Sequence, residues 1–303
     1  MDIREFSKNG GGAFQYVPPR CFELAGQKFE LQMDDGYDIV LDFVDKKTLK
    51  WNYVNKEPSK PQTDTYECLK GDDTTYLVSW NLAGCEMMHR INFTFVLDLE
   101  QMLVTHLVAT VGKNVRYPYL VTTEFVFGAI AQEGVEYKSY PRHGFTSDIE
   151  GNIVQWQYSP DMATVHLYYC SDFYRISYPR TAAQSAEGAQ QSESLNAMVS
   201  ALPSSDEPAN YVKIKEGIYL VSCTEQNMEK LMGASMGFRS DTLCFLDNYN
   251  HMYDVGRGFG TMTSPDGTDS DVFVMIGAYG KVIDPATDEF WQKMLADKNP
   301  YLV

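Results

Sequence analysis

The sequence predicts an all-β protein built from two tandem antiparallel β-barrels. Short strand-like segments bounded by turn residues recur along the 303 residues, and long helical periodicity is absent. Aromatic residues make up 13% of the chain, which favours strands because aromatic rings pack well on a pleated surface. The order of motifs in the first half returns in the second half, so the rhythm indicates a repeated unit.

The expected strands of the two halves follow each other at short spacing, as in a meander or barrel. In the first half, Asp34-Asp35-Gly36 reads as a hairpin turn after the first strand. We expect strands in the first half at 27–33, 37–43, 48–54, 66–70, 75–80, 91–97, 102–111 and 120–127. We expect strands in the second half at 152–158, 164–169, 173–178, 211–215, 218–223, 241–247, 252–258 and 272–279.

Three matched stretches support the repeat. The pattern of 66–80 returns at 211–223, RINFTFVLD at 90–98 parallels RSDTLCFLD at 239–247, and 26–52 parallels 151–175 with a small gap. Two barrels of roughly 110–150 residues each are domains of ordinary size. The predicted division is an N-terminal arm (1–18), a first barrel (19–140), a second barrel (141–285) with an inserted loop (181–210), and a tail helix (286–303).

Charge and composition exclude several partner classes. The chain has 25 Lys and Arg against 41 Asp and Glu, a net charge of −16, which repels nucleic-acid phosphates and anionic lipid. No apolar run approaches the ~18 residues that span a membrane, and the start has no apolar segment typical of a signal peptide. The six cysteines show no C-x-x-C spacing, so we expect reduced thiols in the cytoplasm.

The two halves differ at positions where a catalytic or binding site would need polar, charged or aromatic side chains. At matched positions the second half has Trp156 and Tyr158 for Leu31 and Met33, Arg175 for Asn52, and Glu225 for Leu82. An Arg and a Glu inside a barrel are unfavourable unless paired, whereas a concave pocket with aromatic walls suits a ligand. The competing interpretation is that Arg175 and Glu225 pair with each other or lie on the outer face.

Further aromatic and histidine residues complete the predicted pocket. We expect Trp156, His166, Tyr168, Tyr174 and Tyr219 to contact a substrate. His166 would support Tyr158 from a neighbouring strand, although a hydrogen-bonded core histidine is the commoner role. The five histidines show no metal-binding spacing such as H-x-H or H-E-x-x-H, so the sequence predicts no metal site.

The whole chain resembles the molybdenum-cofactor-biosynthesis protein F (MoaF) family, whose members have two halves like the lipocalin/calycin barrels. The second half also resembles the phenolic acid decarboxylases, which are single calycin barrels. Their Tyr-x-Tyr, Tyr-Arg and Trp-Thr-Glu motifs match Trp156-Gln157-Tyr158, Tyr174-Arg175 and Cys223-Thr224-Glu225. This resemblance implies that Tyr158, Arg175 and Glu225 are catalytic, while Trp156 lacks the hydroxyl of its counterpart.

The predicted function is therefore a cofactor-independent lyase, decarboxylase-like, acting on a phenolic or hydroxycinnamate-type aromatic acid. Tyr158 would hold the substrate carboxylate, Glu225 would transfer the proton with a pKa raised by burial, and Arg175 would orient Glu225 or the phenolate. The alternative is a non-catalytic binder of an aromatic or pterin-like molecule, and a second alternative is a scaffold for assembly. The resemblance further implies a possible homodimer.

Overall fold

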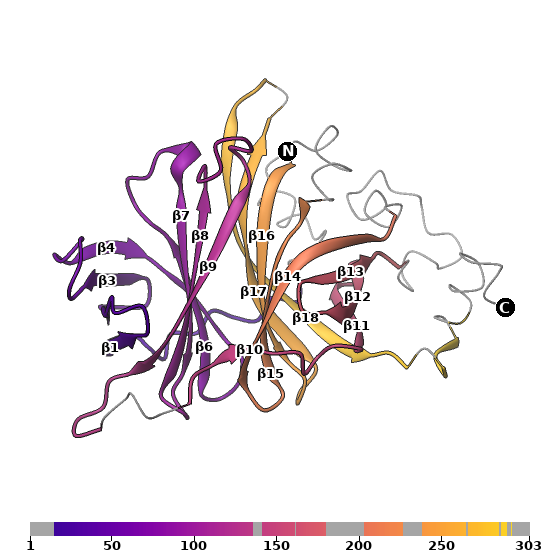
Figure 1. The fold of residues 1–303 in the computed structure, drawn as a ribbon, viewed down its shortest axis with the longest axis horizontal. Coiled ribbons are helices and arrows are strands. Elements are labelled where there is room, and N and C mark those ends of the chain that lie inside the picture. The colour runs from indigo at the N-terminus through magenta and orange to yellow at the C-terminus, as the bar shows by residue number, and fades with distance from the viewer. Residues whose placement is uncertain are drawn as a thin grey trace.

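The computed structural model describes residues 15–135, 141–160, 162–179, 203–226, 238–264, 266–284, 286–289 and 292. Within these residues the chain forms two nine-stranded antiparallel sheets, and each sheet curls into a barrel (Figure 1). The helical element with defined bounds in this part of the chain is one 3-10 turn, η1 (Met87–His89). The predicted all-β fold with two tandem barrels is confirmed.

The first sheet forms the N-terminal barrel, with strand order β4-β3-β2-β1-β9-β8-β7-β6-β5. Its strands β4 and β5 lie on either side of Tyr66, and they pair with β3 and β6 respectively. They act as one interrupted strand that nearly closes the barrel. The strands are β1 (Lys28–Met33), β2 (Ile39–Phe43), β3 (Thr48–Tyr53), β4 (Gln62–Thr65), β5 (Glu67–Lys70), β6 (Thr75–Asn81), β7 (Ile91–Asp98), β8 (Leu103–Val111) and β9 (Val121–Ile130).

The second sheet forms the C-terminal barrel, which is closed because its long strand β14 pairs with β13 through its first part and with β15 through its second. The short strand β10 adds to β14 at Val212 and Lys213. The strands are β10 (Gly144–Phe145), β11 (Ile153–Ser159), β12 (Met162–Cys170), β13 (Phe173–Ser177), β14 (Ser205–Lys215), β15 (Ile218–Thr224), β16 (Phe238–Asn248), β17 (Tyr253–Thr263) and β18 (Asp269–Val282).

Several predicted boundaries differ from the structure or fall outside it: β16, β17 and β18 are longer than predicted, and β4 and β10 were not predicted. Strand β14 begins at Ser205, six positions before the predicted 211, because its polar start alternates with inward residues and pairs with β13. The inserted loop is therefore shorter at its C-terminal end than predicted. Most of that loop, and all but a few residues of the predicted tail helix, lie outside the described residues.

The topology repeats from one barrel to the other, with β4 and β5 together standing where β14 stands. The turn after β7 places Met102 at φ 54°, and the turn after β16 places Met252 at φ 51°. Asp98 accepts backbone hydrogen bonds in the first turn, as Asn248 does in the second. Asp98 is therefore the counterpart of Asn248, so the predicted match to Asp247 is shifted by one residue, which reverses the face of every side chain in the strand.

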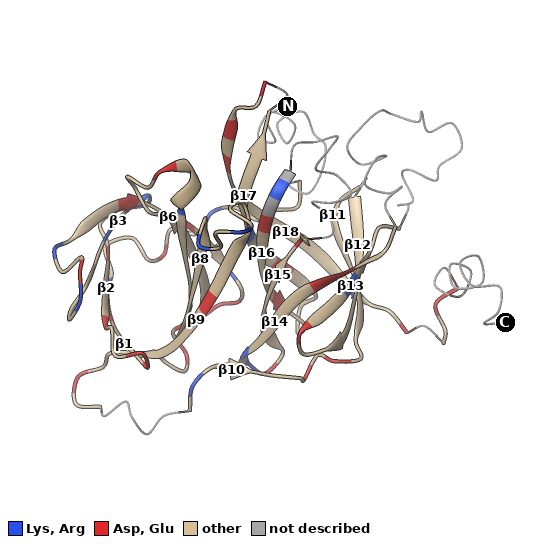
Figure 2. Cartoon of the chain, turned by 45° about the horizontal axis from the view of Figure 1, so that its top comes forward, with Lys and Arg blue, Asp and Glu red and all other residues tan. Residues whose placement is uncertain are grey.

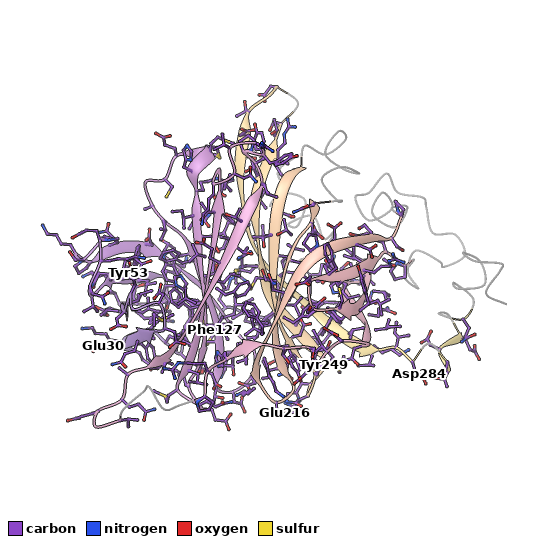
Figure 3. All side chains as sticks on the ribbon, in the orientation of Figure 1. Glu30, Tyr53, Phe127, Glu216, Tyr249 and Asp284 are labelled. Atoms are coloured by element: carbon purple, nitrogen blue, oxygen red, sulfur yellow. The ribbon has the colours of Figure 1, made fainter. Side chains whose placement is uncertain are left out.

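Three apolar clusters hold the molecule together. One fills the N-terminal barrel and one the C-terminal barrel, and a third joins the outer faces of both. The joining cluster packs Leu69, Leu77 and Val96 of the first barrel with Val212, Leu220 and Leu246 of the second. Side chains fill the space between the barrels (Figure 3), and acidic residues are spread over both of them (Figure 2).

Candidate functional site

The interiors of the two barrels differ at equivalent positions. Because the strand order is the same, hydrogen-bonded residue pairs identify counterparts: Leu31 opposite Ile39 corresponds to Trp156 opposite Thr164. At most of these positions the first barrel is apolar and the second carries a polar or ionisable group. The counterparts are Leu31 and Trp156, Met33 and Tyr158, Leu41 and His166, Phe43 and Tyr168, Leu49 and Tyr174, Leu82 and Glu225, Ile91 and Asp241, Leu97 and Asp247, and Val104 and Asp254.

A hydrogen-bonded group surrounds the hydroxyl of Tyr168 inside the C-terminal barrel. Trp156 Nε1 donates to Tyr168 Oη at 3.3 Å, and Tyr168 Oη donates to Asp247 Oδ2 at 3.2 Å. His166 lies between Tyr168 Oη, 3.2 Å from its Nδ1, and Thr164 Oγ1, 3.0 Å from its Nε2. Burial lowers the pKa of His166 to about 3, so its ring is neutral at physiological pH and serves as a hydrogen-bonding group.

Asp247 and Asp254 face each other across β16 and β17. Both residues are about 1% exposed. Burial raises the pKa of Asp247 to about 7, against the opposing effect of the Tyr168 hydrogen bond. Burial, and then the charge of Asp247, raise the pKa of Asp254. Among the described residues, neither carboxyl oxygen of Asp254 accepts a side-chain hydrogen bond, and Asp247 Oδ1 has no partner either.

A second acidic group lies toward the other end of the same barrel. Glu207 on β14, Glu225 just after β15 and Asp241 on β16 face the interior near Cys223. Burial raises the pKa of Glu225, and the charges of Asp241 and Glu207 raise it further. Since Asp241 and Asp247 lie toward opposite ends of β16, the two acidic groups are about 20 Å apart at ~3.3 Å per residue.

Tyrosine hydroxyls and a thiol connect the acidic groups with the centre of the barrel. Tyr174 Oη donates to Cys223 Sγ at 3.5 Å. The ring of Tyr158 lies 6.4 Å from that of Phe245, and burial followed by the charge of Asp254 raises the pKa of its hydroxyl. The interior therefore combines aromatic walls with acidic groups toward both ends.

The structure brings most of the predicted site residues together. Tyr158 is buried in the interior, Glu225 lies half-buried just after β15 on the inward side of Cys223, and five predicted contact residues line the interior with them. These five residues are Trp156, His166, Tyr168, Tyr174 and Tyr219. They occupy positions where the strand alternation places every second side chain inside.

Arg175 does not join this group. Its side chain is 53% exposed on the outer face of β13, where Nε and Nη2 donate to Asp206 at 2.8 and 2.9 Å. Tyr174 takes the inward position, so the adjacent Arg175 must point outward. Its counterpart in the first barrel is Lys50 rather than Asn52, so no charge difference exists at this position. The predicted placement of Arg175 beside Tyr158 and Glu225 is corrected accordingly.

Four acidic residues of the interior were not among the predicted site residues. They are Glu207, Asp241, Asp247 and Asp254. The sequence contained one indication in β16, where Asp241 and Asp247 share a strand face with the apolar residues Leu243 and Phe245. The shifted repeat alignment obscured it, because it assigned Asp247 to the position of Asp98.

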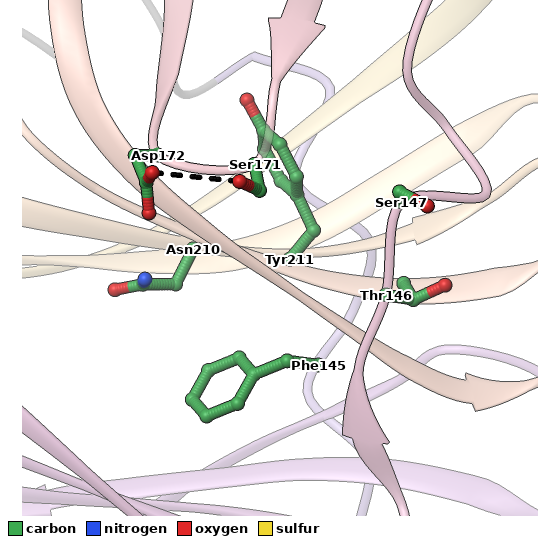
Figure 4. A pocket seen from close by; sticks show the side chains of 7 residues that line it. All are labelled: Phe145, Thr146, Ser147, Ser171, Asp172, Asn210 and Tyr211. Carbon is green, nitrogen blue, oxygen red and sulfur yellow. Dashed lines mark hydrogen bonds between the residues drawn. The ribbon is translucent and has the colours of Figure 1, made fainter.

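A cavity of about 390 Å³ lies outside the barrel interior (Figure 4). Several of its polar groups are engaged locally: Ser171 Oγ donates to Asp172 Oδ2, and Tyr211 Oη donates to the carbonyl of Phe173. We therefore place the candidate site in the barrel interior rather than here. The cavity is lined by Phe145, Thr146, Ser147, Ser171, Asp172, Asn210 and Tyr211.

Metal ligands and membrane-spanning helices were sought in the same parts of the chain. The described residues contain no group of three or more His, Cys, Asp or Glu side chains arranged to hold a metal ion. No helix among them has the length and hydrophobicity needed to cross a bilayer.

A known protein family matches the part of the chain that contains most of the first barrel. Residues 9–113 match the family model of the MoaF N-terminal domain. The resemblance to MoaF is thereby confirmed over this part of the chain, which runs from the N-terminal arm to the end of β8. The candidate site lies beyond the MoaF-matched residues, so the match does not describe it.

The chain was also compared with curated proteins and with solved structures. No curated protein matches the chain. Among solved structures, the chain is similar to "a putative beta-lactamase from Burkholderia vietnamiensis", with 9% identity and a TM-score of 0.28. That alignment covers 46% of this chain and 100% of the other.

Proposed function

We propose that the C-terminal barrel binds a small aromatic molecule in its interior and that Glu225 and Tyr158 are the groups placed to exchange protons with it. The observation that carries the proposal is the contrast at equivalent positions. Both interiors hold tyrosines and a histidine, but the first barrel has one interior carboxyl group, Asp64, whereas the second has a group of carboxyl side chains toward each end. Buried polar groups are unfavourable for folding, so a function is the simplest reason for keeping them in one copy.

Aromatic rings provide the walls of the proposed site. Trp156, Tyr158 and Phe245 present faces and edges to the interior, as pockets for small ring compounds commonly do. The hydroxyls and carboxyl groups then fix the orientation of the ligand. In this arrangement Glu225 is a suitable general acid or base, because burial beside two carboxyl groups holds its pKa above the ordinary value.

Binding is favoured over decarboxylation as the primary role. A lyase acting on a phenolic acid needs a cation to balance the substrate carboxylate, and Arg175 lies on the outer face. Among the described residues, the buried arginines are Arg90 and Arg257, and both contact the interface between the barrels. The decarboxylase-like lyase is the second candidate, with a protonated Glu225 and Tyr158 as its carboxylate-binding groups. We also propose a reducing cytoplasmic location, consistent with six free thiols.

The test is a panel of aromatic acids, alcohols and amines, measured by thermal shift, calorimetry and carbon dioxide release. The proposal expects binding that weakens in Tyr158→Phe and Glu225→Gln but not in the outer-face control Arg175→Ala. Turnover that disappears in Glu225→Gln would favour the lyase. Wild-type protein that binds no compound of the panel would contradict the proposed site.

A further inference from the structure

We propose that the ligand of the C-terminal barrel carries a positively charged nitrogen, which is held between the carboxyl groups of Asp247 and Asp254. This inference rests on the proposed function and names the chemical class of its ligand: an aromatic amine or amidine rather than an aromatic acid. The interior of the barrel supports it through unmatched charge, an unpartnered carboxyl group and the position of the rings.

The first step concerns charge. Asp247 and Asp254 are directly opposite each other on adjacent strands and point to the same face. Like charges in this position repel, and burial strengthens the repulsion because the local dielectric is low. In the first barrel the same two positions hold Leu97 and Val104, which pack in the apolar core. The acidic pair is therefore a feature of the second barrel and is not required by the fold.

The second step concerns hydrogen bonding. Both carboxyl oxygens of Asp254 lack a side-chain partner among the described residues, although this residue is 99% buried, and the nearby backbone N–H of Ala278 only partly offsets the effect of burial on its pKa. Asp247 uses one oxygen for Tyr168 and leaves Oδ1 without a partner. No hydrogen bond joins the two carboxyl groups, so they do not form a proton-sharing dyad here. A buried acceptor without a donor is unfavourable by about 1–3 kcal/mol, more when charged, and an N–H group of a ligand would satisfy it.

The second acidic group, at the other end of the barrel, also lacks a described cation beside its tyrosine. Tyr178 Oη has no hydrogen-bond partner among the residues that the structure describes, although the residue is only 8% exposed. The charges of Glu225, Glu207 and Asp241 raise the pKa of Tyr178, so this hydroxyl is directed toward the second acidic group. Its counterpart Tyr53 contacts the ammonium group of Lys56, 4.3 Å from the ring centre. The equivalent tyrosine of the first barrel thus already has a cation beside it.

The titratable groups that face the Asp247 and Asp254 pair leave it without a cationic partner. The described groups are tyrosines, whose pKa burial raises, and His166, whose pKa burial lowers, so all are neutral near pH 7. These groups are Tyr158 on β11, His166 and Tyr168 on β12, Tyr219 on β15 and Tyr249 in the turn after β16.

The aromatic rings are placed to hold the remainder of such a ligand. Trp156 packs against Tyr249 with ring centres 6.4 Å apart, and Tyr158 lies the same distance from Phe245. Aromatic faces attract cations as well as rings, so walls of this kind suit a ring that bears an amine.

The experiment compares three probes with one phenol ring and different charges: tyramine (cation), tyrosol (neutral) and 4-hydroxyphenylacetate (anion). We expect calorimetry at pH 7 to show tyramine binding at least about tenfold more tightly than tyrosol, a difference of about 1.4 kcal/mol. Binding of tyramine should also release protons, measured by repeating the titration in buffers of different ionisation enthalpy, because the cation favours ionised carboxyl groups.

Variants distinguish the inference from the proposed function. Asp254→Asn and Asp247→Asn should abolish the preference for tyramine over tyrosol and retain tyrosol binding, which also shows that the variants fold. Asp206→Asn on the outer face is the matched control and should keep the preference. Tyrosol or the anion binding as tightly as tyramine would overturn the inference and leave the proposed site intact. Failure of all three probes to bind would overturn both.

Discussion

Trp51 Nε1 donates a hydrogen bond of 2.7 Å to Asp64 Oδ2 inside the N-terminal barrel. The counterpart of Asp64 in the other barrel is Glu207, and the counterpart of Trp51 is Ile176, which has no donor. The first barrel thus satisfies its interior carboxylate by its own side chain. In the second barrel the donor to Glu207 is instead Ser205 Oγ, at 2.9 Å, and further carboxyl groups lie nearby.

The stability of the ligand-free protein should fall as the pH rises through the range in which Asp247 ionises. The folded-state pKa of about 7 lies above the ordinary value of 3.8, so the unfolded chain loses its proton first. The stability contribution is therefore complete below pH 3.8 and is lost as the pH approaches 7.

Asp247→Asn should reduce this dependence, leaving the part due to Asp254 and Glu225, and raise the free energy of unfolding at pH 8 by about 1–3 kcal/mol, since one pKa unit is about 1.4 kcal/mol. Urea titrations at pH 5 and pH 8 would measure it, with Asp206→Asn as the control. An unchanged difference between the two pH values would contradict the buried state of Asp247.

Lys215 should be an important link between the barrels. Its ammonium lies 2.7 Å from Asp72, 3.0 Å from Glu100 and 3.9 Å from Asp98, and its side chain is 10% exposed. Lys215→Ala would leave these carboxylates without their cation, so we expect the free energy of unfolding to fall by about 3 kcal/mol. Lys213→Ala is the control, because its partners are more exposed and an exposed pair contributes about 1 kcal/mol or less.

Arg175→Ala should leave ligand binding unchanged. The side chain pairs with Asp206 on the outer face, and an exposed ion pair of this kind contributes about 1 kcal/mol or less. Calorimetry with the best ligand of the panel would check the prediction beside Tyr158→Phe. A loss of affinity or turnover in Arg175→Ala comparable to that in Tyr158→Phe would return the arginine to the active site and exclude the arrangement described above.

Cys21 should ionise at a lower pH than an ordinary thiol. The neighbouring Cys68 thiol is the main cause that lowers the pKa of Cys21 to about 6, against the effect of burial, since Cys21 is only 9% exposed. Alkylation of Cys21 by iodoacetamide, followed by mass spectrometry, should therefore rise with pH and level off near pH 7. Cys68→Ala removes this thiol and should move the profile upward by at least one pH unit. An identical profile in the variant would exclude the Cys68 thiol as the cause.

The fold could be predicted from the sequence because alternation and turn residues mark strands directly. The interior positions of Trp156, Tyr158 and Glu225 were also predictable, since each could be matched to an apolar residue of the first half. Strand parity depends on every intervening residue, however, and a shift of one position was enough to misassign Asp247. Register irregularities in β11 and β14 add further shifts that no turn residue announces.

The predicted inward position of Arg175 was wrong for a related reason. It is adjacent to Tyr174, so the motif that suggested the pair placed both residues in one pocket, although neighbours in a strand point to opposite faces. The unpartnered carboxyl oxygens of Asp254 could not be predicted from the sequence at all. Whether a buried acceptor finds a donor depends on contacts among side chains of β11, β12, β16 and β17, which only the folded barrel defines.

The apolar contact between the barrels has a wider consequence. Leu69, Leu77 and Val96 are the counterparts of Val212, Leu220 and Leu246, so each barrel contributes the same patch to the joint. This is the contact of a two-fold symmetric dimer, with both subunits placed on one chain. In a dimer of identical chains every mutation changes both subunits, whereas in this chain a mutation changes only one of the two barrels. The tandem arrangement allows the interior of one barrel to change while the other remains its structural partner.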